Sequence, residues 1–172
     1  EVLSPRESTI DHFLTQRAEH FIGRFAKREN PFFFALNYWG PHEPAYVPTQ
    51  FLDRYRHKEL TPWNSFNEDQ ETKPMIHNMK RRKASWGEFE QGIRHVLAYG
   101  EYIDDEIGRL ITFLKEKGIY DSSYIIFTCD HGNSLGAHGG LTDKGFHMYE
   151  ETVHIPLIVK PPKGTRYTEK AG

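Results

Sequence analysis

The stretch SYIIFTCDHGNSLGAHGGLTDKGFHMYEETVH, residues 123–154, decides how the rest of the chain is interpreted. It begins with a short apolar run, residues 124–128, that does not alternate with polar residues. Such a run beside glycine-containing sequence is typical of a strand that is buried on both faces of a sheet. Asp130 and His131 follow, so they lie at the carboxyl end of the predicted strand, where open α/β sheets bind ligands.

Length and composition narrow the class of protein. A chain of 172 residues has room for one domain with a sizeable core, and its net charge of −2 argues against a nucleic-acid binder. The single cysteine, Cys129, excludes an internal disulfide and a cysteine-based zinc site. No apolar run is long enough to span a bilayer. The first residue is not Met, so we expect a processed, tagged or truncated chain whose export signal, if any, lies outside this sequence.

The order of helical and apolar segments predicts the fold class. Apolar residues recur at helical spacing in residues 10–27 and in residues 86–117, and Gly118 follows the second segment as a C-cap. Helices that alternate with strands predict an α/β fold with a mostly parallel sheet sandwiched between helices and right-handed crossovers. The apolar runs predicted as strands are residues 32–38, 124–128 and 155–159.

We expect these segments to form a single domain, residues 1–172, with an ordered core from about 8 to 162 and a tail at 163–172. Residues 45–85 show no sustained period, and a loop of this length is usually functional or mobile. The one basic run, Lys80-Arg81-Arg82-Lys83, is favoured as a solvated face. Binding of a nucleic acid or another anion by this run is a weaker alternative.

His42 lies on a stiff turn, Trp39-Gly40-Pro41-His42-Glu43-Pro44, because its two prolines exclude a helix. The turn follows the apolar run at 32–38, so parallel strands would bring His42 to the same sheet edge as Asp130 and His131. Taken alone, a histidine in such a loop is more often a hydrogen-bonded loop residue than a catalytic one. Its position is what favours a functional interpretation.

Asp130, His131 and Lys144 together indicate chemistry on an anion. Asp130 and His131 can ligate one cation if the backbone turns sharply at Gly132, and by ligand hardness the pair suits Zn²⁺ or Mn²⁺ better than Ca²⁺. Two ligands are too few for a closed site. A lysine beside such a cation is repelled unless an anion lies between them, which is the arrangement of a sulfate or phosphate ester site.

Several ordered motifs resemble the sulfatase family of the alkaline phosphatase superfamily. FTCDHGNSLGAHG at 127–139, then Lys144-Gly145 and YEETVHIPLI at 149–158, resemble the closing segment of its catalytic domain. PHEPAYVP at 41–48 resembles the histidine turn of that family, and YIDDEIGRLITFLKEKGIYDSS at 102–123 resembles one of its helices. The resemblance runs from about Ile10 to Pro162.

The resemblance implies a role for each matching residue. Asp130 and His131 would be metal ligands, and Lys144 would bind the sulfate or phosphate oxygens. His42 would contact the same group and assist departure of the leaving oxygen, so His42 and Lys144 would be both catalytic and substrate-binding. The metal implied by the resemblance is Ca²⁺ first, with Mn²⁺ or Zn²⁺ as alternatives seen in phosphonate and phosphodiester hydrolases. His138 receives no role.

One large departure from the family remains. Its nucleophile is a formylglycine made from Cys or Ser in a C/S-x-P-S/A-R motif, and the 172 residues contain no such motif and no early Asp-Asp metal pair. Cys129 lies within a predicted strand and is not the modified residue. We therefore expect an incomplete, C-terminal part of the catalytic domain. The formylglycine and the remaining part of the domain would lie outside this chain, and the fragment alone would be inactive.

The sequence thus supports the hypothesis of a metal-dependent sulfuric ester hydrolase that acts on a sulfated small molecule or carbohydrate. A phosphonate monoester or phosphodiester hydrolase is the first alternative, and a non-catalytic metal- or partner-binding fragment is the second. The resemblance favours an exported protein, whether periplasmic, secreted or lysosomal. No nucleic-acid partner and no membrane span are expected.

Overall fold

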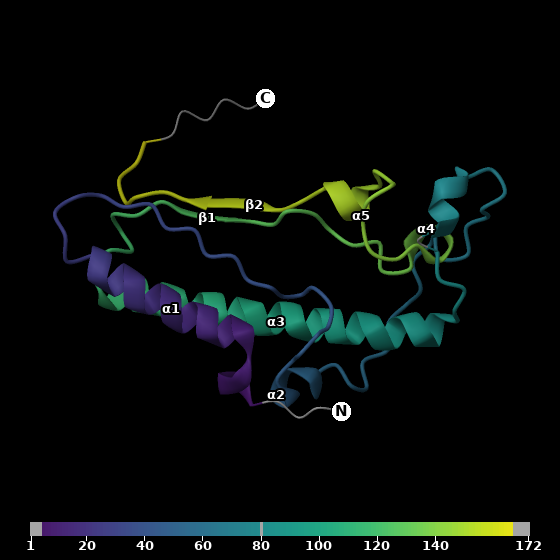
Figure 1. Ribbon diagram of the computed structural model, residues 1–172, viewed down its shortest axis with the longest axis horizontal. Coiled ribbons are helices and arrows are strands. Elements are labelled where there is room, and N and C mark those ends of the chain that lie inside the picture. The colour runs from purple at the N-terminus through teal and green to yellow at the C-terminus, as the bar shows by residue number, and fades with distance from the viewer. Residues whose placement is uncertain (1–4, 80, 167–172) are drawn as a thin grey trace.

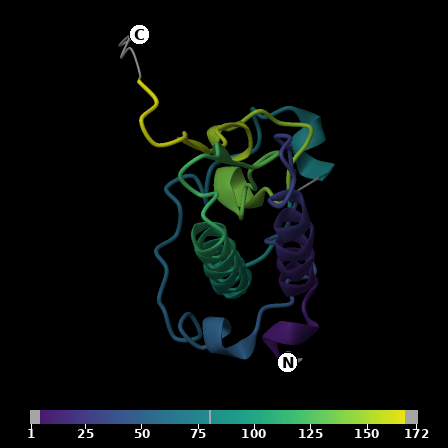
Figure 2. The same ribbon diagram turned by 90° about the vertical axis from the view of Figure 1, so that its left-hand side faces the viewer.

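The computed structural model describes residues 5–79 and 81–166. Two long helices, α1 (Ile10–Phe25) and α3 (Trp86–Glu116), form one layer, and strands β1 (Ile125–Thr128) and β2 (Leu157–Lys160) form a second layer above them (Figure 1). Figure 2, viewed along the helices, shows that they lie side by side. The short helices are η1 (Arg6–Ser8), α2 (Thr49–Leu52), η2 (Met75–Met79), α4 (Ala137–Gly140) and α5 (Glu150–Val153).

Both long helices begin and end where the sequence predicts. The Thr9 side chain accepts a hydrogen bond from the backbone N–H of His12 and caps α1. At the start of α3 the backbone N–H of Ser85 donates to the Glu88 carboxylate, 2.8 Å away. Gly118 follows α3 in the left-handed conformation, with φ of 70°, as a C-cap requires. The helix predictions are confirmed to within a few residues.

The core lies along α3 in two clusters. One cluster fills the space between α3 and α2, and the other joins α3 to α1. Tyr99 and Tyr102 are the largest fully buried side chains, so aromatic rings supply much of the packed volume. The buried members are Val47, Phe51, Ala98, Tyr99, Tyr102 and Ile103 in the first cluster and Ala18, Ile22 and Leu114 in the second.

The contact between α1 and α3 also contains a buried charge. The Glu106 carboxylate is fully buried and accepts from Arg6 Nε at 2.6 Å, His12 Nδ1 at 3.0 Å and Arg109 Nη1 at 3.3 Å. Burial acts to raise the pKa of Glu106, but hydrogen bonds from Thr15, His12 and Arg6 outweigh it, so the pKa lies below the ordinary 4.5. Glu106 is therefore an ionised part of the helix interface.

The strand pairing differs from the predicted one. β1 and β2 pair antiparallel, with Ile125 opposite Lys160 and Thr128 opposite Leu157, and they form the only sheet within the described residues. The prediction of a mostly parallel sheet is wrong for this pair. The segment between β1 and β2 contains only the short helices α4 and α5, and it returns the chain beside β1 in the opposite direction instead of crossing the sheet as a long helix. Residues 32–38 follow an irregular path without strand pairing.

Apolar side chains on this sheet layer remain uncovered. Phe33 is 90% exposed, Leu157 is 70% exposed and Ile126 is 61% exposed, so the predicted burial of these strands on both faces is not met by residues 5–79 and 81–166. So many exposed large apolar side chains on a strand pair are unusual on a free-standing domain and are typical of an interaction surface. The structure is therefore that of an incomplete sheet layer on a complete helix pair.

Two further expectations concern the predicted tail with the basic run and the predicted absence of a membrane span. Residues 167–172 of the predicted tail lie outside the described residues, as does Lys80 of the basic run. Within the described ranges, no helix combines the length and apolar composition that a bilayer crossing requires.

The buried charge generates a stability prediction. The pKa of Glu106 is lower in the folded state, so its contribution is present above the unfolded value near 4.5 and is lost as the pH falls through the folded value. We expect Glu106→Gln to lower the stability of the full-length protein by about 3–5 kcal/mol near neutral pH. Urea unfolding measured from acid to neutral pH should also show that the variant loses less free energy of unfolding than the wild type as the pH falls.

The matched control is Glu116→Gln, which makes the same change at the exposed end of the same helix. It should change stability by less than about 0.5 kcal/mol. Equal effects of the two substitutions would contradict the role given to Glu106.

Candidate functional site

The turn that carries His42 follows Tyr38 and is closed by its own backbone. The N–H of His42 donates to the carbonyl of Trp39 at 3.2 Å, and the ring centroids of the two residues lie 4.9 Å apart. His42 Nδ1 donates to the carbonyl of Glu43 at 2.6 Å. Since Nδ1 makes this bond, the hydrogen-bond pattern assigns its proton there and leaves Nε2 as the outward-facing nitrogen.

Lys144 meets that outward-facing nitrogen. Its Nζ lies 3.1 Å from His42 Nε2, although the two residues are 102 positions apart in sequence. Lys144 also pairs with Asp143 at 3.1 Å, and its side chain keeps access to solvent. When Nε2 is also protonated, the ammonium and the imidazolium can each donate to an oxygen of the same anion. The structure therefore brings together the two residues that the sequence predicts as catalytic.

Asp130 and His131 lie just beyond β1 and face each other. His131 Nε2 lies 3.3 Å from Asp130 Oδ2, and the Asp130 side chain is 83% exposed. His131 Nδ1 donates to the carbonyl of Gly132 at 2.9 Å, which directs the lone pair of Nε2 toward the carboxylate. Two electron-rich atoms at this distance repel unless a proton or a cation binds to them. The donor set thus fits one side of the coordination shell of a cation.

A complete metal site needs more ligands than this pair. Calcium takes six to eight oxygen ligands and zinc takes about four ligands. Within residues 5–79 and 81–166 there is no cluster of three or more His, Cys, Asp or Glu side chains placed to hold a metal. The described residues therefore provide this pair, and no third His, Cys, Asp or Glu placed beside it.

Gly132 has a different role from the predicted one. The sequence suggested that it provides conformational freedom, but it is absent from the glycines with positive φ. Its N–H donates to the carbonyl of Thr152 at 3.0 Å, and a Cβ atom built on it would overlap the carbonyl oxygen of Glu151. Gly132 is therefore required for close approach of the Asp130-His131 turn to α5.

His138, which the sequence left without a role, holds the glycine-rich loop to the long excursion at 45–85. Its Nδ1 lies 2.8 Å from Glu68 Oε2, its Nε2 lies 3.2 Å from Glu151 Oε2, and its ring stacks on Tyr149 at 3.7 Å. Hydrogen bonds from Lys73 and His138 lower the pKa of Glu68. Sequence spacing carries no signal for this contact because its two sides are about seventy residues apart.

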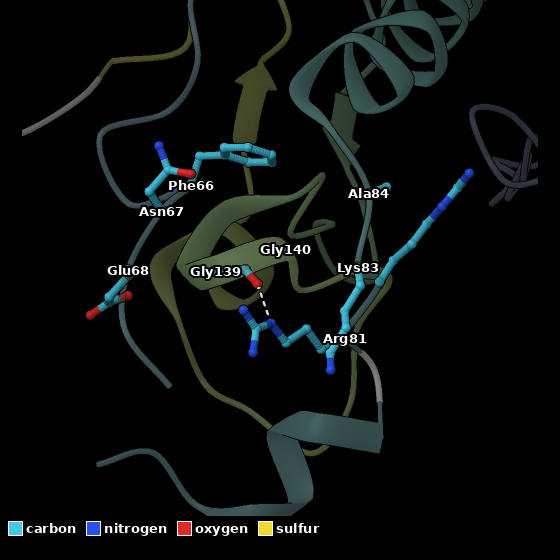
Figure 3. A pocket seen from close by; sticks show the side chains of 9 residues that line it. Phe66, Asn67, Glu68, Arg81, Lys83, Ala84, Gly139 and Gly140 are labelled. Carbon is cyan, nitrogen blue, oxygen red and sulfur yellow. Dashed lines mark hydrogen bonds between the residues drawn. The ribbon is translucent and has the colours of Figure 1, made fainter. Parts of the chain in front are cut away.

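A shallow cavity of about 310 Å³ lies beside this loop (Figure 3). Arg81 Nε donates to the carbonyl of Gly139 at 2.7 Å, shown as the dashed line in Figure 3. Arg81 of the basic run therefore supports the glycine-rich loop, which the sequence did not predict. The lining residues are Phe66, Asn67, Glu68, Arg81, Arg82, Lys83, Ala84, Gly139 and Gly140.

Comparison with known proteins shows which family the chain belongs to and how much of its relatives' length it covers. A sequence model of the family described as Sulfatase matches residues 2–171. The chain is 30% identical over 161 residues to the uncharacterized sulfatase YidJ of Escherichia coli, with 92% of this chain and 32% of that protein covered. It is 26% identical over 191 residues to human iduronate 2-sulfatase, with 100% of this chain and 34% of that protein covered. The chain thus spans about a third of the length of these relatives.

Among solved structures, the chain resembles the phosphonate monoester hydrolase of Agrobacterium radiobacter with a TM-score of 0.78. The two are 20% identical, and the match covers 92% of this chain and 34% of that one. A likeness at this identity shows the fold alone. Together with the family match, it confirms the predicted fold class, an incomplete α/β domain of the alkaline phosphatase type.

The close approach at Gly132 can be tested by substitution. Gly132→Ala places a methyl group where the Glu151 carbonyl lies, so we expect a loss of about 1–3 kcal/mol in the full-length protein. Gly92→Ala is the control, because its Cβ meets nothing within 4 Å and helix α3 favours alanine. Thermal unfolding should show a lower midpoint for the first variant only, and an unchanged midpoint for Gly132→Ala would contradict the assignment.

Proposed function

Because this chain belongs to the sulfatase family, we propose that the protein it forms part of is a metal-dependent sulfuric ester hydrolase. The observation that carries the proposal is the 3.1 Å approach of Lys144 Nζ to His42 Nε2. This places an ammonium group and an imidazole nitrogen that can take up a proton at one point, which suits hydrolysis of a sulfate monoester. In the net reaction, a sulfate monoester and water give an alcohol and hydrogen sulfate.

Each of the two residues has a distinct role in this proposal. Lys144 donates to the oxygens of the sulfuryl group and balances the charge that develops there. Once His42 is protonated at Nε2 as well as at Nδ1, it transfers the Nε2 proton to the ester oxygen as the bond from sulfur to that oxygen breaks, and it is left as the neutral Nδ1 tautomer. Both side chains then contact the same sulfuryl group. Their exposure to solvent leaves that group room to bind between them.

Asp130 and His131 would hold one divalent cation, and we propose Ca²⁺ first, with Mn²⁺ and Zn²⁺ as alternatives. The facing donor atoms 3.3 Å apart support this assignment. When bound, the cation polarises a sulfate oxygen as a Lewis acid. The chain's own contribution is to fix the two donors, since His131 is oriented by the Gly132 carbonyl and the turn is held against α5.

The remaining part of the sulfatase domain would supply the formylglycine nucleophile and cover the exposed sheet layer. The uncovered side chains of Phe33, Ile126 and Leu157 support this, since other strands and helices of the same domain would bury them. In this proposal residues 1–172 alone do not turn over an ester.

A phosphonate monoester hydrolase is the second candidate. The fold match to such an enzyme favours it, and Lys144, His42 and a bound cation suit phosphonate oxygens as well as sulfate oxygens. We place it second because the matching family model is that of the sulfatases, and YidJ and iduronate 2-sulfatase are named as sulfatases. Iduronate, the sugar acid named in the relative iduronate 2-sulfatase, supports a sulfated carbohydrate as the substrate class. The family resemblance supports an exported enzyme.

Turnover of aryl esters tests the proposal. We expect the full-length protein to hydrolyse 4-nitrophenyl sulfate with a higher kcat/KM than an aryl phosphonate monoester. His42→Ala and Lys144→Ala should each lower kcat/KM by about 10²–10⁴. His154→Ala and Lys163→Ala change the same residue types at exposed positions and should leave the rate unchanged. A clear preference for the phosphonate would favour the second candidate instead.

Metal content tests the ligand assignment independently of turnover. We expect Asp130→Ala to lower the affinity of the full-length protein for a divalent cation by at least about tenfold. Elemental analysis and calcium titration measure this directly. Asp121→Ala, at an exposed aspartate near Lys163, is the matched control and should bind metal as the wild type does. Equal metal content in Asp130→Ala and wild type would refute the assignment.

A further inference from the structure

We propose that Asp11 and Tyr99 are positioning residues that fix His42 for the proposed reaction, and this inference rests on the proposed function. Neither residue contacts His42 directly. Asp11 belongs to α1 and Tyr99 belongs to α3, so the two long helices together would determine where the imidazole lies.

The Asp11 carboxylate holds the start of the His42 turn. Its Oδ1 accepts the backbone N–H of Trp39 at 3.0 Å and that of Gly40 at 3.3 Å. Its Oδ2 accepts the hydroxyl of Tyr99 at 2.6 Å. The carboxylate is fully buried, so all three hydrogen bonds are charge-assisted and shielded from water.

Tyr99 also supports the turn by direct contact. A Cβ atom built on Gly40 would overlap the Tyr99 ring, so the backbone of the turn lies directly on that ring. Tyr99 is itself almost fully buried in the core cluster along α3, where its ring stacks on that of Tyr102. The ring is therefore a fixed surface beneath the turn, and its hydroxyl fixes the carboxylate beside it.

Two contacts transmit this position from the turn to the imidazole. The carbonyl of Trp39 accepts the N–H of His42, and the Trp39 ring packs against the His42 ring. Trp39 is the residue whose own N–H Asp11 holds. A shift at Asp11 would therefore move both the backbone and the ring of His42 relative to Lys144.

The charge of Asp11 is difficult to explain by stability alone. Within the described residues Asp11 forms no ion pair, unlike Glu106, which pairs with the two cations Arg6 and Arg109. A buried carboxylate without a counter-ion is costly, and a neutral side chain would pack there at lower cost. What the carboxylate provides is two acceptor sites on one oxygen for two successive N–H groups of the turn.

Leaving-group dependence in the full-length protein tests the inference. If His42 protonates the leaving oxygen, His42→Ala should slow phenyl sulfate, with its poor leaving group, more than 4-nitrophenyl sulfate. Tyr99→Phe and Asp11→Asn should show the same selectivity with a smaller loss, about tenfold in kcat for phenyl sulfate and little change in KM. Adding Tyr99→Phe to His42→Ala should cause no further loss, because the group being positioned is absent.

Tyr102→Phe is the matched control. Tyr102 lies three residues from Tyr99 on α3, is equally buried, and bonds through its hydroxyl to Thr9 rather than to Asp11. Its loss should lower stability without changing the leaving-group selectivity. If Tyr99→Phe slows both esters equally, or if its effect adds to that of His42→Ala, Tyr99 has only a structural role and the inference is wrong.

A crystal structure of full-length Tyr99→Phe separates this inference from the proposed function. We expect His42 Nε2 to be displaced from Lys144 Nζ by more than the error of the coordinates. An unmoved imidazole would overturn the inference even in an active enzyme. A displaced imidazole in a protein that hydrolyses neither ester would support the positioning contact and refute the proposed function.

Discussion

A single buried carboxylate, that of Asp11, joins the two long helices to the turn that carries His42. It accepts one hydroxyl from α3 and two backbone N–H groups from the turn, and no ion pair balances it in the described part of the chain. Its charge is stabilised by these hydrogen bonds, which restrict the groups that donate them to a narrow geometry. The helices and the turn are therefore connected through one group.

The second buried carboxylate of the same helix pair works differently. Glu106 accepts hydrogen bonds from Arg6, His12 and Arg109, so it links the helices, and none of these contacts involves His42 or Lys144. The helix pair is thus a platform on which the site is built from loops. One wall of the site comes from the turn at His42, and the other comes from the glycine-rich loop with Lys144.

The sequence predicted the elements that depend on local periodicity and motif, and missed those that depend on distant contacts. Both long helices, the cap at Gly118 and the meeting of His42 with Lys144 followed from spacing or from the family resemblance. The roles of these two residues remain predictions. Antiparallel pairing was missed because an apolar run does not encode the direction of its neighbour. The role of Asp11 was missed because a buried acceptor of distant N–H groups has the same local sequence pattern as an exposed residue in the first turn of a helix.

The central claim is that His42 and Lys144 hold one oxyanion between them. A crystal structure of the full-length protein with inorganic sulfate bound measures this most directly. The account predicts that Lys144 Nζ and His42 Nε2 each lie within hydrogen-bond distance of oxygens of the same sulfate. A sulfate that binds elsewhere, or that contacts Lys144 while His42 points away from it, would contradict the account.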